Sequence, residues 1–247
     1  MTTFRNALAG LLLLLSAPAW AQEAAPFEAR LDLLRNDKLA GEMTFELESD
    51  ADSWTMSSET RGVKGLARLL GLHEQSVGHG DWVDAAPRPL RYERTVDVVR
   101  TLRWSAAFDW SRNVVHTVYP DGESTLELPP GAVDEAALGL VIRQGLARGA
   151  SEWRLPLVDE DEIENAHFRT RSVEKLQTAL GCVTAHVVEK VRREGSRRYT
   201  RTYYSAEHRF APVRMEHGKQ GGDRIEARIV SLTLADDPVR PGPDCAH

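Results

Sequence analysis

Long apolar stretches are scarce in this 247-residue chain, and the longest lies near its beginning. A helix that crosses a bilayer needs about 20 apolar residues, and the run over residues 7–17 is much shorter. Arg5, this run and the small residues Ala19 and Ala21 together match the three-part pattern of a secretory signal peptide. We therefore expect cleavage after Ala21, which removes residues 1–21 and leaves a periplasmic protein that does not span the membrane.

An excess of positive charge is also lacking. The chain has 31 Lys and Arg residues against 37 Asp and Glu residues, and its formal net charge is −6. Such a chain has no general attraction for nucleic acid, so no nucleic-acid partner is expected.

Familiar catalytic motifs are missing as well. The sequence contains no G-x-S-x-G nucleophile elbow, and no P-loop or dinucleotide-binding glycine motif. We assign no catalytic residue, no metal ligand and no cofactor. These observations favour a protein that is not an enzyme, although a dispersed acidic site would leave no local signature.

Cysteine is rare, with only Cys182 and Cys245. Cys245 lies in a polar, proline-rich tail over residues 237–247, where no apolar pattern gives it a packing role. An even number of cysteines in an oxidising compartment permits a disulfide. We predict a Cys182–Cys245 bridge that fixes the tail to the body, the alternative being two unpaired thiols.

What the chain does have is alternation of apolar and polar residues with a period of two. Segments such as "FEARLDL", "GEMTFELE" and "PLRYERTVDVV" read as half-buried strands. Two segments break the pattern: residues 63–71 predict a short helix, and residues 134–149 predict the main helix. Because strands and helices do not alternate, the sheet should be antiparallel. We expect one mainly β domain over residues 22–236: a large curved antiparallel sheet, or incomplete barrel, with one main α-helix and a short second helix.

The stretch "HEQSVGHGDW", residues 73–82, concentrates residue types that bind metals or act as bases. On a strand, His73 and His79 would lie roughly 20 Å apart at about 3.3 Å per residue, which one zinc ion cannot bridge. The spacing also differs from the i, i+4 pair of H-E-x-x-H. We interpret the stretch as a polar strand in which Gly78 and Gly80 permit a bend.

Aromatic residues are concentrated on a few predicted strands. Such residues most often pack in a core, but on a curved sheet they can also line a cavity. The candidate ligand-lining residues are Trp54, Trp82, Trp104, Phe108 and Trp110.

A basic stretch follows in the C-terminal half. It forms either the charged outer face of an exposed hairpin or a surface for phosphates of envelope lipids or acidic polymers. Its candidate residues are Arg192, Arg193, Arg197, Arg198 and Arg201.

Several local patterns occur together in one order: "HEQSVG", "PRPLRYERT", "FDWSRNVV", "VDEAALGLVIRQGL", "RTYYSAEHRFAPVRMEH" and "RIEARIVSL". In this order they resemble a family of exported bacterial proteins that is classed as a domain of unknown function. That family is similar in pattern to periplasmic half-barrels that carry lipoproteins or other apolar cargo. The resemblance implies a fold by analogy and supplies no catalytic residues.

Three functions follow as hypotheses. The first is non-enzymatic binding or carriage of an apolar or amphiphilic ligand of the cell envelope, which a lined cavity would favour. The second is a hydrolase of an envelope polymer, which converging carboxylates with perturbed pKa values would favour. The third is a protein-interaction or assembly module, which a filled interior with an exposed apolar patch would favour.

Overall fold

Antiparallel strands make up most of the structure, a computed structural model that describes residues 25–246. The expected signal peptide, residues 1–21, lies outside the described residues. A first series of strands, interrupted by one short helix, precedes the main helix. The elements of this first series are β1 (Phe27–Arg35), β2 (Lys38–Ser49), β3 (Ser53–Gly62), the short helix α2 (Gly65–Leu69), β4 (His73–Val83), β5 (Ala86–Asp97), β6 (Thr101–Asp109), β7 (Val114–Tyr119) and β8 (Gly122–Glu127).

The main helix is α3 (Glu135–Ala147), and a second series of strands follows it. The elements of this series are β9 (Glu152–Asp159), β10 (Glu162–Thr178), β11 (Gly181–Lys190), β12 (Arg198–Ser205), the 3-10 turn η1 (Ala206–His208), β13 (Ala211–Lys219), β14 (Arg224–Leu234) and β15 (Asp237–Pro238). The expected fold class is confirmed: one large antiparallel sheet that does not close into a barrel, with one main helix and one short helix.

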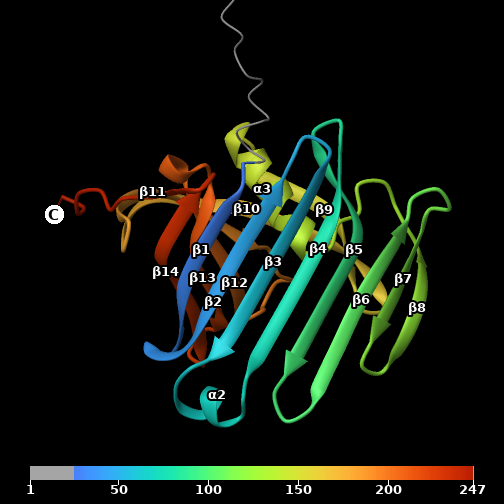
Figure 1. Ribbon diagram of the computed structural model, residues 1–247, viewed down its shortest axis with the longest axis horizontal. Helices are drawn as coiled ribbons and strands as arrows, with labels where there is room; N and C mark the ends of the chain where they lie inside the picture. Colours follow the sequence, from blue (N-terminus) through green and yellow to red (C-terminus); the bar gives the residue numbers. More distant parts are fainter. Residues whose placement is uncertain (1–24, 247) are drawn as a thin grey trace, which may run out of the picture.

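The two series of strands join through β1, the first strand of the described chain, and β14, its last long strand (Figure 1). β1 pairs with β14, from Phe27 opposite Leu234 to Arg35 opposite Ile225. The resulting order is β8-β7-β6-β5-β4-β3-β2-β1-β14-β13-β12-β11-β10-β9, with the short β15 added to β14. The edge strands β8 and β9 are therefore the two strands that flank α3 in the sequence.

The opening between β8 and β9 is bridged without a strand pair. The loop before α3 makes a parallel bridge from Val133 to Leu157 of β9. The turn between β9 and β10 contacts β6 and β7, because Trp104 Nε1 donates to Glu160 Oε1 at 2.8 Å and Thr117 Oγ1 donates to the Glu160 carbonyl at 2.6 Å. Side chains and a loop thus hold the curved sheet partly closed.

Helix α3 packs against β3, β4, β5 and β9 on one face of the curved sheet (Figure 1). Its N-cap is the buried Asp134, whose Oδ1 accepts a hydrogen bond from the Ala137 amide at 2.7 Å. The helix approaches β4 closely at Gly78, where an added Cβ would lie 2.4 Å from the Cβ of Ala136. The glycines in the polar stretch 73–82 thus make room for neighbours, and the β4–β5 register shifts between His79 and Gly80.

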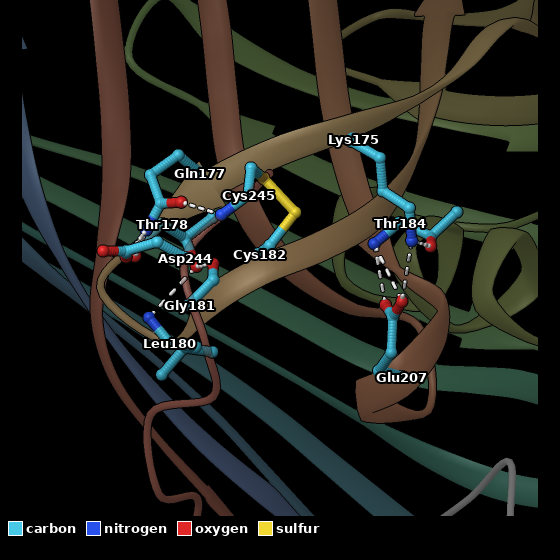
Figure 2. Close-up of a disulfide and its surroundings, with 10 residues drawn as sticks. All are labelled: Lys175, Gln177, Thr178, Leu180, Gly181, Cys182, Thr184, Glu207, Asp244 and Cys245. Carbon is cyan, nitrogen blue, oxygen red and sulfur yellow. Dashed lines mark hydrogen bonds and ion pairs between the residues drawn. A yellow bond between two sulfur atoms is a disulfide. The ribbon is translucent and has the colours of Figure 1, made fainter. Parts of the chain in front are cut away.

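The predicted disulfide is confirmed, with Cys182 and Cys245 joined at a Cα–Cα distance of 4.7 Å (Figure 2). Backbone hydrogen bonds continue on both sides of it. The Gly242 amide donates to the Leu180 carbonyl at 2.9 Å, and the Cys182 amide donates to the Pro243 carbonyl at 2.8 Å. The tail therefore runs alongside the start of β11, and the bridge fixes it there.

Candidate ligand-binding cavity

A partly enclosed, mostly apolar cavity of about 300 Å³ lies between α3 and the sheet. Residues of both series of strands, which meet at the β1–β14 pair, form its walls. Its lining comprises Phe27, Phe45, Met56, Ser57, Ser58, Ser76, Glu135, Ala136, Leu138, Gly139, Ile142, Arg143, Phe168, Val188, Lys190, Thr200, Thr202, Tyr204, Pro212 and Met215.

One face of α3 forms a wall of this cavity. Leu138, Gly139, Ile142 and Arg143 recur at the spacing of a single helical stripe and all line it. A Cβ added at Gly139 would meet no heavy atom within 4 Å. The missing side chain at this position therefore leaves part of the space open.

Arg143 is the unusual member of the lining. Its side chain is only 2% exposed, and its guanidinium carbon lies 4.4 Å from the centre of the Phe27 ring. Nη2 donates to the Arg209 carbonyl at 3.3 Å, whereas Nε and Nη1 have no hydrogen-bond partner among the described residues. Burial lowers the pKa of Arg143 to about 10.

Other polar side chains of the lining are paired. Lys190 Nζ contacts Glu164 Oε2 at 2.5 Å, and Glu135 Oε2 accepts from the Tyr92 hydroxyl at 2.9 Å. Burial raises the pKa of Tyr204 to about 12, so its hydroxyl stays protonated and can act as a donor. The lining therefore combines an apolar surface with one buried guanidinium that lacks an anionic partner.

The five aromatic residues that the sequence suggested as lining are absent from this cavity. Trp54 is 1% exposed and packs 6.4 Å from Trp82, and Phe108 stacks on Trp110 at 6.0 Å between ring centres. Trp104 lies under Arg94, beside the turn that contains Glu160. The structure groups them as two packed pairs and a separate tryptophan.

The basic residues of the C-terminal half occupy two different places. Arg192, Arg193, Arg197 and Arg198 surround a shallow polar hollow at the loop between β11 and β12. Arg201 lies on β12 and pairs with Glu216 of β13 at 3.5 Å. The sequence stretch therefore does not form one continuous basic patch.

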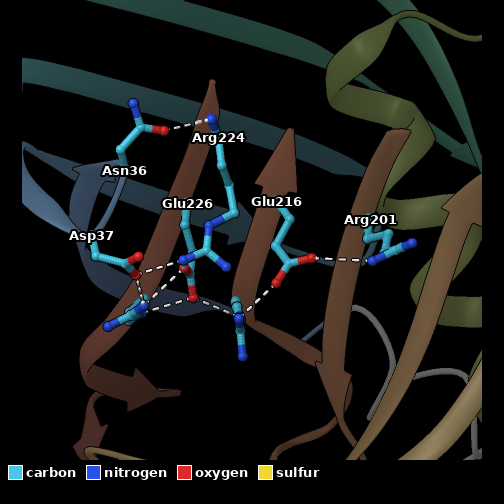
Figure 3. A network of polar contacts seen from close by, with 8 residues as sticks. Asn36, Asp37, Arg201, Glu216, Arg224 and Glu226 are labelled. Carbon is cyan, nitrogen blue, oxygen red and sulfur yellow. Dashed lines mark hydrogen bonds and ion pairs between the residues drawn. The ribbon is translucent and has the colours of Figure 1, made fainter. Parts of the chain in front are cut away.

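Arg201 belongs to a network of charges across β12, β13 and β14 (Figure 3). At its centre Glu226, 1% exposed, forms an ion pair with Arg214 Nε at 2.6 Å and accepts a hydrogen bond from Arg228 Nε at 2.7 Å. Burial raises the pKa of Glu226, but its contacts with Arg228 and Arg214 outweigh this effect and lower the pKa. A carboxylate that is held ionised in this way is unsuited to act as a general acid.

The polar stretch on β4 also forms local contacts. His73 Nε2 lies 2.7 Å from Glu59 Oε1 on the neighbouring strand, while His79 is exposed further along. Among residues 25–246, no three His, Cys, Asp or Glu side chains are grouped so that they could hold a metal ion. None of the described helices combines the length and apolar character that crossing a membrane requires.

Comparison with known proteins adds a family and a related fold. A family model described as "Protein of unknown function (DUF3108)" matches residues 34–228. A β-barrel-like protein of the domain of unknown function DUF1849 from Brucella abortus superposes with a TM-score of 0.55 at 12% identity, over 85% of this chain and 98% of that one. A candidate lipoprotein from Parabacteroides distasonis gives a TM-score of 0.36 at 7% identity, over 85% and 96% of the two chains. None of the curated proteins matches the chain.

Proposed function

Because the chain belongs to the DUF3108 family of proteins of unknown function, we propose a role from its cavity: the protein binds a small apolar or amphiphilic molecule between α3 and the sheet. The observation that carries this proposal is the apolar cavity of about 300 Å³. Ligand sites are typically cavities of about 300–1,000 Å³ with apolar walls and a few polar groups. The cavity lies at the lower end of this range, which suits a ligand with a single short apolar tail.

The cavity is distinct from the packed interior around it. Trp54, Phe108 and the buried residues of α3 belong to one hydrophobic core, against which Trp82 and Trp110 pack. Leaving such a volume open costs stability when nothing occupies it. A ligand that fills it would remove this cost and add its own apolar contacts.

We place this binding in the periplasm. The disulfide supports an oxidising compartment, and the sequence of residues 1–21 supports export. An apolar or amphiphilic molecule of the cell envelope is then the ligand class that such a protein would meet. No enzymatic step is required for this role.

Filling the cavity from α3 tests the proposal. Gly139→Leu directs a side chain into the open space, while the loss of a helical glycine favours the fold by about 1 kcal/mol. Binding of the neutral dye N-phenyl-1-naphthylamine is measured by fluorescence titration, and stability by thermal unfolding. Ala147→Leu is the matched control, since it adds the same side chain to an exposed position of α3 outside the cavity.

Wild type and Ala147→Leu should bind the dye saturably, and Gly139→Leu should lose saturable binding without a lower melting temperature. Unchanged dye binding in Gly139→Leu would show that the cavity is not the site. Absence of saturable binding in wild type, tested also with apolar competitors, would remove the proposal.

A further inference from the structure

Arg143 presents a charge that the described part of the chain does not compensate. A buried guanidinium normally sits opposite a carboxylate or satisfies its N–H groups with acceptors. Arg143 has one acceptor, the Arg209 carbonyl, and no carboxylate acts on it. Its Nε and Nη1 are left without partners among residues 25–246.

The position of this charge is fixed. The Phe27 ring lies against one side of the guanidinium at 4.4 Å, and the side chain starts from a residue in the third turn of a capped helix. Phe27 and Arg143 both line the cavity, as does Tyr204. A preorganised donor group in an apolar wall is an arrangement that binds an anion without reorganisation.

The rest of the lining restricts what kind of anion fits. Lys190, the other cation of the wall, is already paired with Glu164. One uncompensated positive charge matches a monoanion better than a doubly charged phosphate monoester. Glu135, which also lines the cavity, repels a doubly charged head group more strongly than a singly charged one.

We propose that the ligand is a single-chain amphiphile with a carboxylate head group, that its tail fills the apolar cavity, and that Arg143 binds the carboxylate. This assignment rests on the proposed function, since it names the class of molecule that occupies the same cavity. It makes Arg143 the residue that selects between acidic and neutral amphiphiles. Charge-assisted hydrogen bonds formed away from water provide that selectivity.

The experiment compares two probes that share a chain and differ in the head group. Decanoate and decanol are each titrated against the bound dye at about pH 8, where a carboxylic acid is ionised. The measured quantity is the ratio of the two affinities. It is determined for wild type, Arg143→Met, Arg143→Lys and Arg154→Met, the last of which removes an equal charge from an exposed site on β9.

Wild type and Arg154→Met should bind decanoate in preference to decanol. Arg143→Met should lower the ratio by about 10- to 100-fold, the range expected for a hydrogen bond to a charged group. Arg143→Lys should retain part of the preference, because it keeps the charge and loses the planar donor group.

Failure of the two proposals can be told apart. If neither probe displaces the dye from wild type, the cavity does not bind such molecules and both proposals fall. If both probes displace it but Arg143→Met leaves the ratio unchanged, the cavity binds amphiphiles and the carboxylate assignment is wrong.

Discussion

Removing the charge of Arg143 should leave the fold intact or strengthen it. Burial lowers the pKa of Arg143 below its ordinary value, to about 10, so the unfolded chain holds this proton more tightly than the folded one. The free energy of unfolding would therefore rise as the pH increases through about 10. At neutral pH the destabilisation caused by the buried charge is fully present. At 1.36 kcal/mol per pKa unit, burial of the Arg143 charge costs on the order of 3 kcal/mol before its contacts with the Phe27 ring and the Arg209 carbonyl are counted.

Two favourable contacts offset part of that cost. The Phe27 ring contributes about 1–2 kcal/mol as a desolvated cation–π contact, and the 3.3 Å hydrogen bond to the Arg209 carbonyl contributes about 1 kcal/mol. Methionine keeps much of the length and the apolar contact of arginine. We expect Arg143→Met to change the free energy of unfolding by between 0 and about 2 kcal/mol in the stabilising direction.

The assay is urea unfolding followed by circular dichroism at about pH 7, because urea does not screen charges as guanidinium chloride does. Glu226→Gln is the comparison, since it removes the centre of a compensated network and leaves Arg214 and Arg228 facing each other. That variant should lose about 3–5 kcal/mol. A comparable loss in Arg143→Met would refute the reasoning, because it would mean that Arg143 holds the fold together instead of awaiting a ligand.

Two further predictions concern the tail and the helix cap. Replacing Cys182 and Cys245 together by alanine opens a loop with a sequence separation of 63 and should cost about 4 kcal/mol in urea unfolding; reductant should lower wild type to the same value and leave the variant unchanged. Burial raises the pKa of Asp134 to about 7, so its contribution to stability is fully present below about pH 4 and is lost as the pH rises through 7. Asp134→Asn keeps the cap and should be more stable than wild type at about pH 8 but not at about pH 4; a difference that does not vary with pH would contradict this assignment.

The parts of the fold that depend on local pattern could be predicted from the sequence. Period-two alternation identified the strands because one face of the sheet is buried and the other is solvated. The bridge between Cys182 and Cys245 followed from a tail without an apolar pattern in a chain with two cysteines. The pairing of β1 with β14 joins residues about as far apart as the described chain allows, and no local signal encodes such a partner.

The site was not predictable in the same way. Alternation shows that Trp104 and Phe108 share a face of β6, but it does not show which part of that face α3 covers. The cavity takes its lining from many elements, and most of these side chains are ordinary core residues in the sequence. One signal was present: Arg143 follows Gly139 by one helical turn and is next to Ile142, so a charge lies on the same stripe as the apolar residues of the predicted main helix.

The topology explains why the candidate site involves α3. Because β1 and β14 pair in the middle of the sheet, the two edges of the sheet are β8 and β9, and the segment between these edges in the sequence is the one that contains α3. The helix thus occupies the interior that a closed barrel would enclose. It packs against β3, β4, β5 and β9, and the cavity lies on the side of the helix that faces β1, β2 and β10–β13. Both the open volume at Gly139 and the unpaired charge of Arg143 belong to this one helix. A ligand that satisfies the charge would also complete the packing of the helix, so its binding should protect the amides of α3 from hydrogen exchange more than those of the distant edge strand β8.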